Sequence, residues 1–130
     1  MILYLIMEVL MTDFSQGELQ KKKCLPCEGG LPSLTAGEAA MYLVGAPGWQ
    51  LSHDGLRIRR EWKVRHFTDA IAFFHEVTKI AEEDGHHPDL HLTNYRNVCI
   101  ELWTHAVGGL TENDFILAAK INSVEVPLNN

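Results

Sequence analysis

The sequence has little of several features that mark particular protein classes. Basic residues are the minority, with 11 Lys and Arg against 17 Asp and Glu, a formal net charge of -6 and a pI of about 5.6. Such an acidic chain opposes the counterion release that drives binding to phosphate backbones, so we expect no direct nucleic-acid partner. It also lacks an apolar run of the roughly 20 residues that a membrane span needs, so we expect no membrane partner.

Cysteine is scarce as well. The odd number of cysteines (Cys24, Cys27 and Cys99) and the absence of an export signal favour reduced thiols in the cytoplasm over a disulfide framework. Cys24 and Cys27 have the spacing of half a structural zinc site, but no second pair follows, and the His-Glu-x-x-His pattern is missing. The sequence therefore argues against a metal site.

The first 34 residues differ in character from the rest. Residues 1–11 are nearly all apolar but carry Glu8, and we interpret them as an extra strand or as translation upstream of an alternative start at Met11. Residues 12–34 are polar and interrupted by glycine and proline, which is typical of an irregular arm. We expect an N-terminal arm over 1–34 and one folded domain over 35–130, a length within the usual domain range.

Three segments of this domain carry helix patterns. Each begins behind a threonine that can cap the helix, and two of these threonines are followed three residues later by an acidic partner. The caps are Thr35 with Glu38, Thr68, and Thr111 with Asp114. Gly45 and Gly85 follow the first two apolar stripes, so we expect those helices to end there.

Strand patterns occur in pairs between these helices. Residues 49–51 and 56–64 flank Asp54-Gly55, a strong hairpin signal, and residues 90–95 and 98–105 are joined through Arg96-Asn97. Alternation along the last strand puts His105 on the face away from the aliphatic core. This order predicts an α+β fold: a four-stranded, mostly antiparallel sheet with about three helices packed on one face.

The residues best suited to chemistry are His86 and His87, directly after the second helix, and His105, at the end of the last strand. Imidazole exchanges protons near neutral pH, so this cluster indicates general acid–base catalysis.

Each candidate also has a plain structural interpretation. A loop histidine is often only solvated, Pro88 can simply stop a helix, and an aromatic side chain in a strand is often packing. Glu82 lies on a solvated helix face, and Asp114 occupies the capping position.

The spacing of these residues resembles the pterin-4a-carbinolamine dehydratase family, also called 4a-hydroxytetrahydrobiopterin dehydratases. The pattern comprises Glu82, His86-His87-Pro88, Tyr95, His105 and Asp114, separated by three, six, nine and eight residues. The wider resemblance covers about residues 35–125. Leu90 and Ala106 depart from residues found in many members, which affects the polarity or fit of the pocket.

The resemblance implies a lyase that removes water from 4a-hydroxytetrahydropterin to give quinonoid dihydropterin, which a reductase recycles for aromatic amino acid hydroxylases. It implies no cofactor, because the ring nitrogen's own electrons expel the hydroxyl.

It further implies that His86 and His105 act as acids from opposite faces of the substrate, while His87 binds the ring and assists proton removal. Glu82 would orient a histidine or the pyrimidine end, and Trp49 would cover the pocket. The predicted substrate-binding set is Glu82, Pro88, Trp49, Tyr95, Thr104 and Asp114.

Other interpretations stay open at this point. The family includes a transcription-coactivator role, so a non-catalytic pterin-binding or protein-interaction module is the main alternative, followed by another pterin- or molybdopterin-related task. A zinc hydrolase is the weakest option. The resemblance also implies a homodimer or homotetramer, and the sequence does not fix the number.

Overall fold

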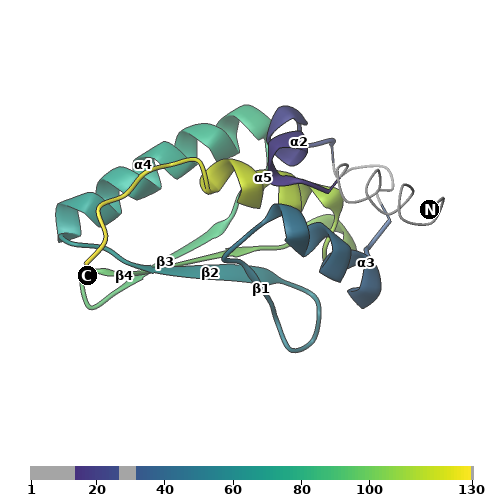
Figure 1. Cartoon of the computed structure of the whole chain (residues 1–130), viewed down its shortest axis with the longest axis horizontal. Helices are drawn as coiled ribbons and strands as arrows, with labels where there is room; N and C mark the ends of the chain where they lie inside the picture. Colours follow the sequence, from purple (N-terminus) through teal and green to yellow (C-terminus); the bar gives the residue numbers. More distant parts are fainter. Residues whose placement is uncertain (1–13, 27–31, 130) are drawn as a thin grey trace, which may run out of the picture.

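The computed structural model describes residues 14–26 and 32–129 (Figure 1). Within these ranges the chain forms helices α2 (Gln16–Lys21), α3 (Ala36–Tyr42), α4 (Phe67–Asp84) and α5 (Glu112–Ile121), 3-10 turns η1 (Leu43–Gly45) and η2 (His105–Val107), and strands β1 (Gln50–Leu51), β2 (Ile58–Lys63), β3 (Asp89–Thr93) and β4 (Asn97–Leu102). The expected strand over residues 1–11 lies outside the described residues. None of the described helices is both long enough and apolar enough to span a bilayer.

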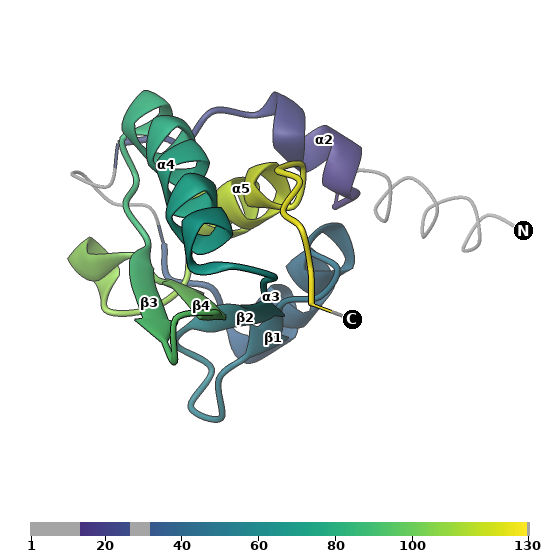
Figure 2. The ribbon, with the colours of Figure 1, turned by 90° about the vertical axis from the view of Figure 1, so that its left-hand side faces the viewer.

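The described strands form one antiparallel sheet in the order β1-β2-β4-β3. The hairpin predicted around Asp54-Gly55 is confirmed, with Leu51 opposite Ile58, and Gly55 takes a left-handed φ of 75° in its loop. Figure 2 shows α4 and α5 across one face of this sheet, with α2 beside α5 on the side away from it. The α+β prediction is therefore confirmed.

The core lies between the sheet and the two long helices. Alternate residues of β2 and β4 point into it, as the period of a strand requires. The buried side chains from these elements include Ile58, Trp62, Val98, Ile100, Leu102, Phe73, Val77, Phe115 and Leu117. Helix α5 is buried on nearly all sides because the sheet and α4 cover one flank and α2 covers the other.

Part of the N-terminal arm is regular, contrary to the prediction of an irregular segment over residues 12–34. The hydroxyl of Ser15 accepts a hydrogen bond from the Glu18 N–H and caps α2, and Leu19 is fully buried in the main core. A helix of six residues has little intrinsic stability. It forms here because Leu19 packs against the rest of the domain.

The predicted helix ends are mostly confirmed. The capping boxes of Thr35 with Glu38 and Thr111 with Asp114 are present, and Gly85 ends α4 at a φ of 65°. The prediction that Thr68 caps α4 is wrong. The cap is His66, two residues earlier, and the helix starts at Phe67, because the Asp69 carboxylate accepts the His66 N–H at 3.0 Å.

The last two strands are shorter than expected. Strand β4 ends at Leu102 rather than at residue 105, because Thr104 pairs with Gly109 in an isolated bridge and the chain turns into η2. Strand β3 ends at Thr93, because Asn94 and Tyr95 adopt left-handed φ values of 47° and 54°. These residues form the turn between β3 and β4.

Candidate functional site

His86 lies where α4 ends and the chain turns toward β3. The left-handed conformation of Gly85 terminates the helix, and the His86 N–H donates to the Ala81 carbonyl at 3.2 Å. Pro88 follows and favours extended backbone before β3. This path turns the His86 side chain inward, and the residue is only 6% exposed.

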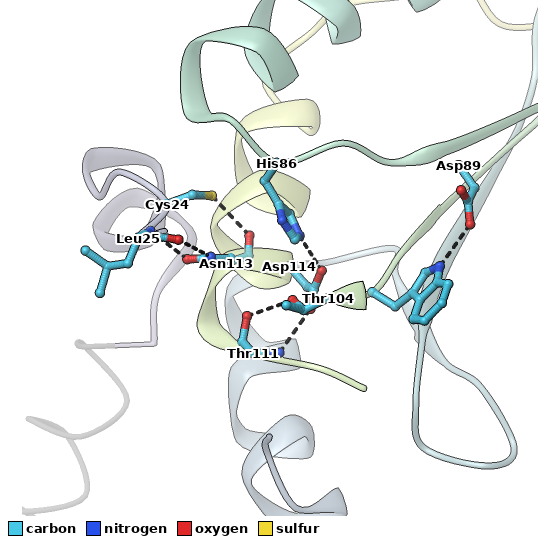
Figure 3. Close-up of polar contacts among 9 residues, drawn as sticks. Cys24, Leu25, His86, Asp89, Thr104, Thr111, Asn113 and Asp114 are labelled. Carbon is cyan, nitrogen blue, oxygen red and sulfur yellow. Dashed lines mark hydrogen bonds and ion pairs between the residues drawn. The ribbon is translucent and has the colours of Figure 1, made fainter. Parts of the chain in front are cut away.

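The imidazole of His86 is held by Asp114 from the first turn of α5 (Figure 3). Its Nε2 atom lies 2.6 Å from Asp114 Oδ1, while Asp114 Oδ2 accepts the Thr104 hydroxyl at 2.8 Å and the Thr111 N–H at 3.0 Å. The hydroxyls of Thr104 and Thr111 are 2.9 Å apart. With Asp114 as a carboxylate, which only accepts hydrogen bonds, the His86 Nε2–H is the donor, and this bond fixes the tautomer and the orientation of the ring.

His87 has a different environment. Its side chain is 63% exposed, and its Nε2 atom lies 3.6 Å from the carboxylate of Glu82, which is itself 70% exposed. An ion pair this open to water contributes little stability. The imidazole of His87 is therefore accessible to a dissolved molecule.

His105 is exposed as well, but its ring is held by a stacking contact with a neighbouring aromatic side chain. It stacks on Trp103 with ring centroids 3.9 Å apart and an angle of 21° between the planes. The Trp103 indole N–H donates to Asp89 at 3.0 Å, and the Arg57 guanidinium lies 4.6 Å from the centroid of the Trp103 ring. Asp89, which Figure 3 also shows, thus anchors the indole that carries His105.

The buried network links the segments that carry all three histidines. His87 adjoins His86, and His105 adjoins Thr104, which donates to the same carboxylate as His86. The Asp114 carboxylate therefore ties together the end of α4 and the segment after β4.

The other predicted site residues do not all lie beside the histidines. Thr104 and Asp114 are fully buried in this network, and Pro88 is partly buried at its edge. Trp49 packs in the core against Trp62 and donates its indole N–H to Asn122 at 2.9 Å. Tyr95 is 49% exposed in the β3–β4 turn, at the opposite end of that hairpin from residues 86–88 and 103–105.

Asp89, Arg57 and Trp103 were not among the residues that the sequence predicted for the site. The position of Asp89 directly after His-His-Pro was an available signal. Arg57 gave none, because its contact with Trp103 depends on the pairing of β2 with β4. Within residues 14–26 and 32–129, no group of three or more His, Cys, Asp or Glu side chains is arranged to hold a metal ion.

Comparisons with known proteins agree with this architecture. Residues 32–124 match the family described as pterin 4 alpha carbinolamine dehydratase. The chain is 51% identical over 115 residues to pterin-4-alpha-carbinolamine dehydratase 2, mitochondrial, of Arabidopsis thaliana, covering 86% of this chain and 62% of that protein. It thus spans less than two thirds of the plant protein's length.

Bacterial proteins match over more of their own length. A candidate pterin-4-alpha-carbinolamine dehydratase of Azoarcus sp. strain BH72 is 41% identical, covering 82% of this chain and 91% of that protein. The crystal structure of a transcriptional coactivator/pterin dehydratase from Brucella melitensis superposes with a TM-score of 0.66 at 33% identity, covering 71% of this chain and 97% of that one. The chain belongs to the pterin-4-alpha-carbinolamine dehydratase family.

Proposed function

We propose that this protein is a hydro-lyase that removes water from 4a-hydroxytetrahydrobiopterin and gives quinonoid dihydropterin in tetrahydrobiopterin recycling. The observation that carries the proposal is the buried Asp114 carboxylate, which binds His86 and connects it to the segments bearing the exposed His87 and His105. Family membership supplies the substrate class.

The reaction is an elimination across the C4a–N5 bond of the pterin. The N5–H bond breaks and gives its proton to a base, the electron pair forms the C4a=N5 double bond, and the C4a–O bond breaks as an acid protonates the departing hydroxyl. Water leaves, and no electrons are exchanged with another molecule. Acid and base groups that titrate near neutral pH suit both proton transfers.

The three imidazoles can divide these roles. We assign His105 as the acid that protonates the hydroxyl, because its ring is exposed and held flat against Trp103. His87, which is exposed beside Glu82, receives the N5 proton. His86 is the corresponding acid for a substrate epimer whose C4a hydroxyl lies on the opposite face, and it donates from the ring nitrogen that does not contact Asp114, while the hydrogen bond to Asp114 stabilises its protonated form.

The test measures dehydration of synthetic 4a-hydroxytetrahydropterin by His86→Ala, His87→Ala and His105→Ala. Loss of an acid or base is expected to lower kcat about 10²- to 10⁴-fold. His75→Ala is the matched control, because His75 is an exposed histidine within α4. Wild-type rates in both His86→Ala and His105→Ala would refute the acid assignment.

The Brucella protein's description as a coactivator favours one alternative, a pterin-binding or interaction module without turnover. Calorimetry with a stable pterin distinguishes the two functions. Binding of the pterin by wild-type protein without any acceleration of dehydration would favour the module and contradict the enzyme.

We also propose that the protein forms a homodimer or homotetramer in the cytoplasm and works alongside an aromatic amino acid hydroxylase. In the described part of the chain, β3 pairs only with β4, so its other edge can accept a strand from a second copy. Light scattering gives the oligomer number, imaging of a tagged full chain gives the location, and co-expression with a hydroxylase tests that link. A monomer at the protein concentration of the activity assay would contradict the proposed homodimer or homotetramer.

A further inference from the structure

We propose that Asp84 and Asn113 are positioning residues, through which the N-terminal segment of residues 15–25, here called the strap, holds the His86–Asp114 pair in place. This inference rests on the proposed function, because it concerns the same histidine. Both residues lie close to the pair in the sequence: Asn113 directly precedes Asp114, and Asp84 is separated from His86 by Gly85 alone.

Asn113 binds the backbone of the strap on both sides of one residue (Figure 3). Its Oδ1 atom accepts the Leu25 N–H at 2.9 Å, and its Nδ2 atom donates to the Leu25 carbonyl at 2.7 Å. The Cys24 thiol donates to the Asn113 carbonyl at 3.5 Å. Asn113 is only 1% exposed, so these bonds replace contacts with water that burial has removed.

Asp84 makes the second attachment, at the last residue of α4. Its Oδ1 atom accepts the Cys24 N–H at 3.2 Å, and its Oδ2 atom accepts the Lys120 ammonium at 2.7 Å. Only 2% of the Asp84 side chain is exposed. One carboxylate thus joins the strap, the end of α4 and the last turn of α5.

The strap is attached to α5 elsewhere too. Leu19 is buried in the core, the Gln20 amide donates to the Ala119 carbonyl at 2.8 Å, and Lys22 pairs with Glu112 at 3.2 Å. The Gln20 contact lies near the C-terminal end of α5, whereas Asn113 lies in its first turn. The strap is therefore held against α5 by one set of contacts and bonded to the residue next to Asp114 by another.

These attachments matter for chemistry because His86 and Asp114 come from different elements. The bond between them is 2.6 Å long, and two segments must keep a fixed separation to preserve it. The strap bonds to the residues beside each partner and ties the end of α4 to the start of α5. Without the strap, the distance between His86 and Asp114 would vary more, and the His86 ring would be held less firmly. A small misplacement of a catalytic group can lower the rate by a large factor.

The experiment compares Asn113→Ala, Asp84→Ala and Asp84→Asn in the full chain, with Gln20→Ala as the matched control that also removes one strap-to-α5 hydrogen bond. Thermal unfolding first establishes that each variant is folded at the assay temperature. The proton on His86 Nε2 is then followed by NMR, through its exchange rate with solvent, and kcat and KM are measured for dehydration.

We expect Asn113→Ala and Asp84→Ala to accelerate exchange of this proton and to lower kcat about tenfold or more, with little change in KM. Asp84→Asn should retain part of the wild-type kcat, because the amide oxygen can still accept the Cys24 N–H. Gln20→Ala should match wild type in both measurements, even if its unfolding temperature falls.

The inference is overturned if Asn113→Ala and Asp84→Ala lower stability while proton exchange and kcat stay at wild-type values, or if Gln20→Ala changes them equally. Failure of the proposed function looks different, because the wild-type protein itself would then not accelerate dehydration. The exchange measurement would still report whether the strap holds the pair.

Discussion

The carboxylate of Asp114 accepts three hydrogen bonds although none of its surface is exposed. A buried charge is tolerated only when such bonds replace its water. One carboxylate oxygen caps α5 and the other holds the His86 ring, so the structural interpretation of Asp114 is confirmed, while its role in the site stays a prediction.

Replacing Thr104 by Val should reveal the strength of this network. The substitution keeps the shape of the side chain but leaves Asp114 Oδ2 without one donor, and we expect a loss of about 1–3 kcal/mol in the free energy of unfolding. Urea unfolding measures it. Thr78→Val is the control, because the Thr78 hydroxyl binds only the Phe74 carbonyl on an exposed part of α4, and it should change stability by less than about 0.5 kcal/mol. Equal losses in both variants would refute a special role for Thr104.

Trp103 offers a second test, directed at His105. Trp103→Phe keeps an aromatic surface but loses the hydrogen bond to Asp89, while Trp103→Ala removes the stack. We expect kcat/KM for dehydration to fall by about threefold to tenfold in the first variant and further in the second, because a less constrained acid meets its substrate correctly less often. Steady-state kinetics at several pH values checks this. The expectation fails if Trp103→Ala retains wild-type kcat/KM.

At the scale of residues, sequence spacing could predict which residues make up the candidate site, but not which of them are buried or which contacts they make. Nothing in the sequence indicates that His86 turns inward while the adjacent His87 stays exposed. That difference follows from the left-handed Gly85 and from the position of Asp114, which depends on the packing of α5 against α4.

At the scale of elements, local signals were most reliable where a side chain binds backbone within the same turn. The boxes at Thr35 and Thr111 were predictable because Glu38 and Asp114 need only their own turn to make those bonds. Strand ends were less predictable, since the end of β4 depends on a bridge between Thr104 and Gly109.

The capping box of α3 gives a prediction about pH. Hydrogen bonds from the backbone and hydroxyl of Thr35 lower the pKa of Glu38 below its ordinary value of 4.5. The lowered pKa means that the ionised Glu38 stabilises the folded state, fully above about pH 4.5 and progressively less as pH falls through the lowered value. Glu38→Gln should therefore be less stable than wild type at neutral pH, and the difference should shrink in acid. Urea unfolding from pH 7 to pH 3 measures it, and a difference that is constant with pH would contradict the prediction.

For the whole molecule, the sheet and the two long helices followed from the order of hairpins and helix patterns. The strap could not be predicted in this way, because Leu19 is the one buried residue of α2 and shows no periodicity in a polar segment that also carries Gly17 and three consecutive lysines. Its position depends on α5, far along the chain, so no local pattern could indicate it. The boundary between an arm over 1–34 and a domain over 35–130 stays a prediction.

Leu19→Ala tests whether the strap folds with the rest of the molecule. Leu19 is fully buried in the same cluster as Phe115 and Ala119, so we expect a loss of about 2–4 kcal/mol in a single cooperative unfolding transition. Calorimetry provides the measurement. Leu25→Ala is the matched control, since that side chain is 57% exposed, and it should have little effect. An unchanged transition in Leu19→Ala would mean that the strap contributes nothing to the folded domain.

The attachment of the strap to α5 also sets an order of events during synthesis. Gln20 and its acceptor Ala119 are 99 residues apart, and Leu25 and Asn113 are 88 apart, so the ribosome makes the strap long before it makes the helix that receives it. Contacts of such long range form late and slow folding. By this logic the nascent chain assembles its sheet and α4 first, and the His86–Asp114 pair is braced only when α5 has emerged and the strap has docked against it.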